Sequence, residues 1–171
     1  MNDGGQAESV ERTGPADVRF GIRLDRIETW SVRAQRWEEG EVPEWAAEDG
    51  SITINVGGEA DSRIVVAITL LARDDQPRAV EAQIAAVYEV AIVPPGEPAP
   101  TTGNIADTAA FMDGLDRPGI KRIANQALRD IAPYMREVVQ SMSVRVWPTE
   151  PIAWASGMPV LPPDFTYDKI N

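Results

Sequence analysis

The feature that most constrains the fold of this chain is a change of hydrophobic period at the segment PPGEPAPTTGN, residues 94–104. Before this segment, apolar residues recur at every second position, which is typical of strands with one face toward a core. After it, they recur every three to four residues, which is typical of helices. Strands followed by helices predict an α+β domain, in which the helices pack on one face of an antiparallel sheet.

Four strands are expected before the change of period. The first begins at Val18 and alternates through Leu24, and the others cover residues 52–56, 62–73 and 79–93. The second is expected to end at Gly57-Gly58, and residues 30–49 lose the alternation, so we expect a long connection there. Residues 1–16 are polar and contain glycine, which predicts a flexible arm before a single domain over 17–168.

Two helices are expected after the change of period, a short one near 105–115 and a long one over about 119–144. Pro133 lies inside the apolar stripe of the longer helix, where proline costs about 3 kcal/mol relative to alanine. The stripe keeps its register across Pro133, so both halves are expected to face the same surface. We favour a kink over a helix that restarts at Pro133, because Ala132 would be a poor N-cap.

The chain contains no cysteine and no histidine. This excludes disulfides, thiolate chemistry, Ser-His and Cys-His nucleophiles, and the usual zinc ligands. Acidic residues stand close together at Asp74-Asp75, Glu38-Glu39 and Asp113/Asp116, and carboxylates alone could support a glycosidase or hold magnesium. Among 27 acidic residues such pairs occur by chance, and solvated turns explain them. The sequence therefore predicts no enzyme, no metal site and no cofactor.

The formal net charge of −11 would repel phosphate backbones, which argues against nucleic acid as a partner. The longest uncharged apolar run, IVVAITLLA at residues 64–72, is less than half of the roughly 20 residues that a membrane span needs. No signal peptide can be recognised at the start of the chain. A cytoplasmic protein without membrane contact is expected.

Five tryptophans lie in the expected connections or just beyond the helices: Trp30, Trp37, Trp45, Trp147 and Trp154. They could be lids over the edge of the core. They could also form a binding surface, because aromatic side chains supply a large contact area at a small entropic cost.

Three segments resemble the SecB family of export chaperones. PYMREVVQSMSVR (133–145) is similar to the family's helix signature, with Pro133, Tyr134, Arg136 and Glu137 matching and Ala132 where the family prefers an aromatic residue. EAQIAAVYEV (81–90) aligns without gaps to a strand of the family, and LPPDF (161–165) is close to its Leu-Pro-Pro motif. IRLDRIE (22–28) and the position of Trp45 add weaker similarity, so the resemblance spans most of residues 18–168.

The resemblance implies a SecB-like four-stranded antiparallel sheet and a homotetramer (a dimer of dimers) or homodimer. It also implies an ATP-independent holdase that binds unfolded or pre-export polypeptides in apolar grooves. Such binding does not require a particular client sequence, because it depends on the burial of apolar surface. The client-binding residues would be Trp37, Val42, Trp45, Trp147 and Trp154. The oligomer interface would contain Val80, Ala82, Ile84, Tyr134, Val138 and Met142, and Glu81 matches an acidic position that docks the SecA motor.

The chain departs from the family at its end. The family continues into a second long helix and, in many members, a zinc-binding tail, whereas this chain stops at Asn171 with neither cysteine nor histidine. Docking to SecA is therefore not expected. The short end suits a chaperone dedicated to the antitoxin of a toxin–antitoxin system, or a standalone or phage-borne relative, at least as well as it suits general export. The alternative from another class is a structural or adaptor protein that reuses the fold to bind one folded partner.

Overall fold

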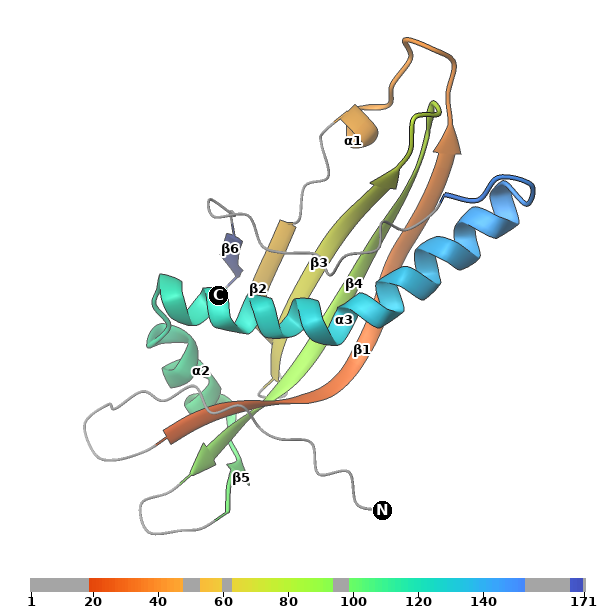
Figure 1. Ribbon diagram of the computed structural model, residues 1–171. Coiled ribbons are helices and arrows are strands. Elements are labelled where there is room, and N and C mark those ends of the chain that lie inside the picture. The colour runs from red at the N-terminus through yellow and green to blue at the C-terminus, as the bar shows by residue number, and fades with distance from the viewer. Residues whose placement is uncertain (1–18, 48–52, 60–62, 94–98, 153–166, 171) are drawn as a thin grey trace, which may run out of the picture.

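The computed structural model describes residues 19–47, 53–59, 63–93, 99–152 and 167–170. This part of the chain forms one sheet and two substantial helices (Figure 1). The strands are β1 (Arg19–Arg36), β2 (Thr53–Glu59), β3 (Arg63–Arg73), β4 (Arg78–Val93), β5 (Thr101–Thr102) and β6 (Tyr167–Ile170). The helices are α1 (Glu44–Ala47), α2 (Ile105–Asp113) and α3 (Arg117–Val146).

The four long strands are antiparallel and follow the order β1-β4-β3-β2 across the sheet. The short β6 adds to β2 in parallel, and β5 pairs with the end of β4. Helices α2 and α3 lie over one face of this sheet (Figure 1). The expected α+β class, with a four-stranded antiparallel sheet and helices on one face, is confirmed.

β1 is much longer than the sequence predicts. It continues through Trp30 to Arg36, so the expected connection over residues 30–49 begins seven residues too early. The register shifts between Leu24 and Arg26 and again between Thr29 and Ser31, which marks two β-bulges. Each bulge inserts one unpaired residue and reverses the alternation, and this hides the strand from a period-two pattern.

β2 also extends beyond its predicted end. Gly57 and Gly58 pair with Val65 and Ile64 of β3, so the two glycines lie within the strand and do not terminate it. Pairing with a full-length neighbour overrides the weak strand preference of glycine.

The main core lies between the sheet and the two helices. Its strand residues alternate along β4 as predicted: Val80, Ala82, Ile84, Ala86, Tyr88 and Val90. Buried residues of α3 cover them, among them Ile123, Ile131 and Met135, each with an exposed fraction of 0%. A smaller cluster on the opposite face of the sheet consists of Val65, Ala67, Ala85 and Val87. All four residues of this cluster belong to β3 and β4.

α3 is one continuous helix, and Pro133 lies inside it. It begins at Arg117, after the N-cap residue Asp116, whose Oδ1 accepts a hydrogen bond from the Gly119 amide at 2.8 Å. Pro118 occupies the first turn, where proline is tolerated. A helix restart at Pro133 is thereby excluded. Figure 1 shows the helix axis changing direction near its middle, so that the C-terminal half runs over β1. The apolar stripe stays on the core side in both halves.

Candidate client-binding surface

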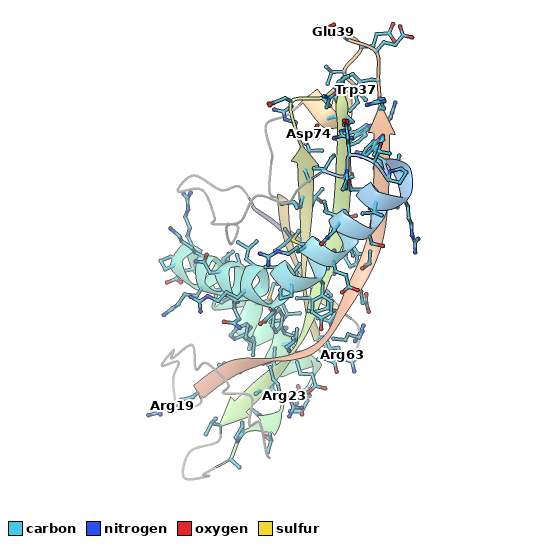
Figure 2. All side chains as sticks on the ribbon, turned by 45° about the vertical axis from the view of Figure 1, so that its right-hand side comes forward. Arg19, Arg23, Trp37, Glu39, Arg63 and Asp74 are labelled. Atoms are coloured by element: carbon cyan, nitrogen blue, oxygen red, sulfur yellow. The ribbon has the colours of Figure 1, made fainter. Side chains whose placement is uncertain are left out.

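The turn between β3 and β4, residues 74–77, gathers segments that are distant in sequence; we call this part of the molecule the hairpin end. The Trp37 amide, just after β1, donates to the Pro77 carbonyl at 2.9 Å. The Arg73 Nη1 donates to the Ala46 carbonyl of α1 at 3.2 Å. Figure 2 shows Trp37 and Asp74 at this end, with Glu39 projecting beyond them. One backbone hydrogen bond and one hydrogen bond from the Arg73 side chain thus attach the crossover, residues 37–47, to the hairpin.

Arg78 attaches the end of α3 to the same hairpin. Its guanidinium donates from Nε to both carboxylate oxygens of Asp74, at 3.2 and 3.1 Å, and from Nη2 at 2.5 Å. Its Nη1 donates to the Glu150 carbonyl at 2.6 Å, and the Trp147 ring stacks on the guanidinium with its centroid 5.1 Å away. Arg78 is only 3% exposed, and the bidentate carboxylate compensates for burying its charge.

A second arginine–tryptophan pair involves Arg33 and Trp45. The Arg33 guanidinium lies 4.2 Å from the centroid of the Trp45 ring. The same guanidinium binds Glu81 through two contacts of 2.9 Å, from Nη2 to Oε2 and from Nε to Oε1. A guanidinium can stack on an aromatic face while its edge binds a carboxylate, and this geometry uses both capacities.

The two pairs lie on opposite faces of the sheet. Arg78 alternates with the core residues of β4 and is on the helix side, beneath Trp147. Glu81 has the opposite orientation, and its strand partner Arg33 therefore lies on the face away from α2 and α3. Trp45 and Trp147 are therefore separated by the sheet and do not line one continuous groove. The tryptophans expected to bind clients therefore do not all share one face of the sheet.

The predicted client-binding residues differ in accessibility. Val42 is 47% exposed, and Trp37 and Trp45 are half-buried beside it in the crossover. Trp147 is 8% exposed and belongs to the main core. Trp154 lies outside the described residues. The accessible part of the predicted set is thus the crossover.

The predicted interface residues also divide into buried and accessible ones. Val80, Ala82 and Ile84 are 0% exposed beneath α3, so in this conformation a second chain cannot touch them. Tyr134 is 49% exposed on α3, and Val138 and Met142 are partly buried at the margin of the core. The Glu81 carboxylate, predicted to dock a motor, is already paired with Arg33. An effect of the three strand residues on assembly would be transmitted through the core.

Sequence reasoning missed Arg33, Arg78 and the accessibility of Trp30. Trp30 occupies the second bulge of β1, is 47% exposed, and donates from Nε1 to Glu28 Oε2 at 3.0 Å. This hydrogen bond lowers the pKa of the Glu28 carboxyl, and a hydrogen bond from the Arg26 guanidinium lowers it further. Its sequence position could have identified Arg78, because it stands at the start of an apolar strand, directly after a turn with two aspartates.

Two classes of site are not found in the described residues. No group of three or more acidic side chains there could hold a metal ion. None of their helices is long and apolar enough to cross a membrane.

No family model matches the chain, and no curated protein matches it. Among solved structures, the chain is similar to a SecB-like chaperone of Mycobacterium tuberculosis, which was solved in complex with a ChAD peptide from the HigA1 antitoxin. The TM-score is 0.43 at 14% sequence identity, and the alignment covers 78% of this chain and 86% of that chain.

Proposed function

We propose that the protein is an ATP-independent chaperone of the SecB-like kind, which works in the cytoplasm and holds unfolded polypeptides without a cofactor. The observation that carries this proposal is where the best-matching segments lie. PYMREVVQSMSVR (133–145) forms the C-terminal half of α3, and EAQIAAVYEV (81–90) lies in the central strand β4. Each segment has the secondary structure that the resemblance implies, and both contribute to the main core.

The crossover offers the surface on which a client would be held. Trp37, Val42 and Trp45 retain exposed apolar area there. A backbone hydrogen bond from Trp37 and a side-chain hydrogen bond from Arg73 attach the segment to the hairpin. Each roughly 100 Å² of apolar surface that a client buries contributes about 2.5 kcal/mol. Several such contacts are needed to offset the entropy lost on association. A preorganised crossover reduces that loss.

Trp147 has a supporting role in this proposal. Its ring is buried against Arg78, and the Ile152 amide donates to Ser143 Oγ, which folds residues 147–152 back over the end of α3. Contact between Trp147 and a client would require this packing to open. We therefore assign first contact to the crossover.

Suppression of aggregation tests the proposal. A chemically unfolded client is diluted into buffer without nucleotide, and light scattering is followed at increasing ratios of the protein. We expect scattering to fall for the native chain and to return for the combined variant Trp37→Ala, Val42→Ala and Trp45→Ala. Trp30→Ala is the matched control, because it removes an exposed indole outside the crossover. No suppression at molar excess, or equal loss in the control, would overturn the proposal.

We further propose a short client range, with a toxin–antitoxin antitoxin as the dedicated client. The support is that the solved structure to which the chain is similar is a SecB-like chaperone in complex with a ChAD peptide from an antitoxin. Affinities for an antitoxin encoded beside this protein and for a generic unfolded client would be compared by titration. Equal affinities would favour general holdase activity.

An adaptor for one folded partner is the second candidate, favoured by the sheet face opposite α2 and α3. The small apolar residues at its centre are buried, and the ion pairs Arg23–Glu89 and Arg33–Glu81 lie beside them with both arginines exposed. Arginine is enriched in interfaces between folded proteins, which favours a folded partner for this face. Arg23→Glu would abolish such a complex and leave aggregation suppression unchanged, because the Arg23 side chain is 66% exposed on this face and outside the crossover. The two candidates are therefore separable.

A further inference from the structure

A short segment after α3, residues 147–152, folds back onto the end of that helix. We call it the strap; in Figure 1 it is the blue segment that follows α3. Its first and last side chains are buried, with Trp147 8% and Ile152 2% exposed. The four residues between them are exposed. The strap is therefore fixed at its two apolar ends, and its middle faces solvent.

Hydrogen bonds from buried side chains hold the strap by its main chain. Arg78 Nη1 donates to the Glu150 carbonyl at 2.6 Å, and Ser143 Oγ accepts a hydrogen bond from the Ile152 amide. Arg78 and Ser143 are only 3% and 0% exposed. Because every polypeptide carries carbonyl and amide groups, these two contacts do not select the sequence of the strap.

The apolar contacts of the strap are equally general. Trp147 stacks on the Arg78 guanidinium, and both apolar ends of the strap belong to the main core. Two positions after Arg78 on the same face, Val80 has Ala34 of β1 and Ala72 of β3 as its neighbours across the sheet. The helix side of the sheet thus carries small side chains at this end, and the large side chains of the strap complete the core there. Another aromatic and aliphatic pair would bury similar apolar area.

The strap closes on itself as a small unit. The Glu150 amide donates to the Trp147 carbonyl at 3.3 Å, which closes a β-turn with Pro148 at its second position. Opening the strap disrupts the contacts of six residues and leaves the pairing of β4 with β1 and β3 in place. Local opening of such a unit costs less free energy than unfolding of the whole domain.

We propose that the strap occupies a second polypeptide-binding site, and that a segment of an unfolded client displaces it. The client segment offers an aromatic ring to Arg78, an aliphatic side chain to the core, and carbonyl and amide groups between them. An unfolded chain has these groups available, whereas a folded protein has already buried or bonded them. The strap is then an internal competitor, which reduces the apparent affinity for clients in proportion to the fraction of molecules in which the site is open.

The site is distinct from the crossover but adjoins the same hairpin. Arg78 follows Pro77, whose carbonyl accepts the hydrogen bond from the Trp37 amide. Trp147 lies on the helix side of the sheet and Trp45 on the other face, so a client that occupies both sites passes around the hairpin end. The inference rests on the proposed chaperone function, and it names the kind of segment that is held after first contact at the crossover.

Hydrogen exchange in the native full-length chain tests the displacement, with reduced and carboxymethylated lactalbumin as the unfolded client. At saturation with client, we expect the Trp147 and Ile152 amides to exchange at least about tenfold faster, while the amides of β3 and β4 keep their rates. Unchanged or slower exchange of the strap at saturation would overturn the inference and leave the proposed chaperone function intact.

Truncation of the two apolar ends of the strap tests the competition. In the opened variant, Trp147→Ala with Ile152→Ala, the affinity for the same client should rise at least about tenfold. The matched control is Val144→Ala with Val146→Ala, which truncates two exposed side chains in the last turn of α3 and should bind like the native chain. Should the opened variant fail to fold, Ile152→Ala alone is milder and should raise the affinity by a smaller factor. Affinities equal to that of the native chain would overturn the inference.

A peptide with the sequence of the strap, WPTEPI, tests which segment the site accepts. At millimolar concentration it should displace client from the opened variant, whereas the same peptide with serine in place of tryptophan and isoleucine should not. Equal competition by the two peptides would overturn the inference. If the native chain takes up no client, the proposed function fails, and the opened variant still decides the inference: uptake supports it, and no uptake overturns it.

Discussion

Tyr88 of β4 donates a hydrogen bond from Oη to Asp130 Oδ2 of α3 at 2.8 Å. Gln126 Nε2 donates to the other carboxylate oxygen at 3.1 Å. Burial raises the pKa of the Tyr88 phenol far above its usual value, and the bond to the Asp130 carboxylate raises it further. This bond joins the central strand to the helix across the core.

Tyr88→Phe should lower the free energy of unfolding by about 1–3 kcal/mol, the range for a hydrogen bond to a charged acceptor. The phenyl ring keeps the packing of the Tyr88 ring, so the loss of stability measures the contribution of the hydroxyl group. Urea denaturation measures it, with Tyr134→Phe as the control, because that ring is 49% exposed. Equal stability of Tyr88→Phe and the native chain would contradict the assignment.

Met135 and Tyr134 are neighbours on α3 with opposite environments, at 0% and 49% exposed. Met135→Ala should cost about 2–5 kcal/mol because it leaves a cavity in the core. Tyr134→Ala should cost less than about 1 kcal/mol in the isolated chain. Thermal and urea unfolding of both variants would test which side of the helix faces the core. A larger loss of stability for Tyr134→Ala than for Met135→Ala would show that this assignment is wrong.

Pro133→Ala tests whether the bend in α3 is imposed by the core. Alanine is favoured over proline in a helix interior by about 3 kcal/mol. Ile131 and Met135 are both 0% exposed on either side of Pro133, and we expect their packing to retain the bend. The gain in stability should therefore be below about 1 kcal/mol. A gain close to the full propensity difference would mean that a straight helix fits the sheet equally well.

The Asp74–Arg78 pair should make the hairpin end sensitive to acid. The hydrogen bonds from Arg78 lower the pKa of the Asp74 carboxyl below its usual value. A carboxyl with a lowered folded-state pKa stabilises the fold above its unfolded pKa of about 3.9, and this stability is lost as the pH falls through the lowered value. Asp74→Asn should therefore be destabilised at pH 7, and its difference from the native chain should shrink below pH 4.

Urea midpoints and tryptophan emission at pH 7, 4 and 3 measure this effect, since Trp147 stacks on Arg78. Asp75→Asn is the matched control, because it removes the same charge from the adjacent turn residue. Parallel pH profiles for the two variants would show that Asp74 has no special role.

The two helices and the inward face of β4 could be predicted because their signals are local. Along α3 the buried positions recur with the helical period on both sides of Pro133, and along β4 every second residue from Val80 to Val90 is buried. The length of β1 could not be predicted, because Asp25 and Trp30 are bulge residues that break the alternation. Its extent depends on pairing with β4, which is distant in sequence.

The candidate site was predicted less completely. The crossover tryptophans, Trp37 and Trp45, are half-buried, because a charged, proline-containing segment is kept at the surface. The buried state of Trp147 could not be read from its neighbours in sequence, since it depends on Arg78, 69 positions earlier in the chain. The burial of Val80, Ala82 and Ile84 follows from their period, but only the position of α3 shows that the helix of the same chain covers them.

The sequence by itself determined the α+β class, the order of strands and helices, and the register of the apolar stripe, because each depends on a periodicity within a few turns or residues of chain. Only the tertiary structure decided that Trp45 and Trp147 lie on opposite faces of the sheet, each against a different arginine. The physical reason is that a strand directs successive side chains to opposite faces. The face on which a loop tryptophan packs therefore depends on the strand residue that it contacts. Contacts between segments distant in sequence determine which residue that is.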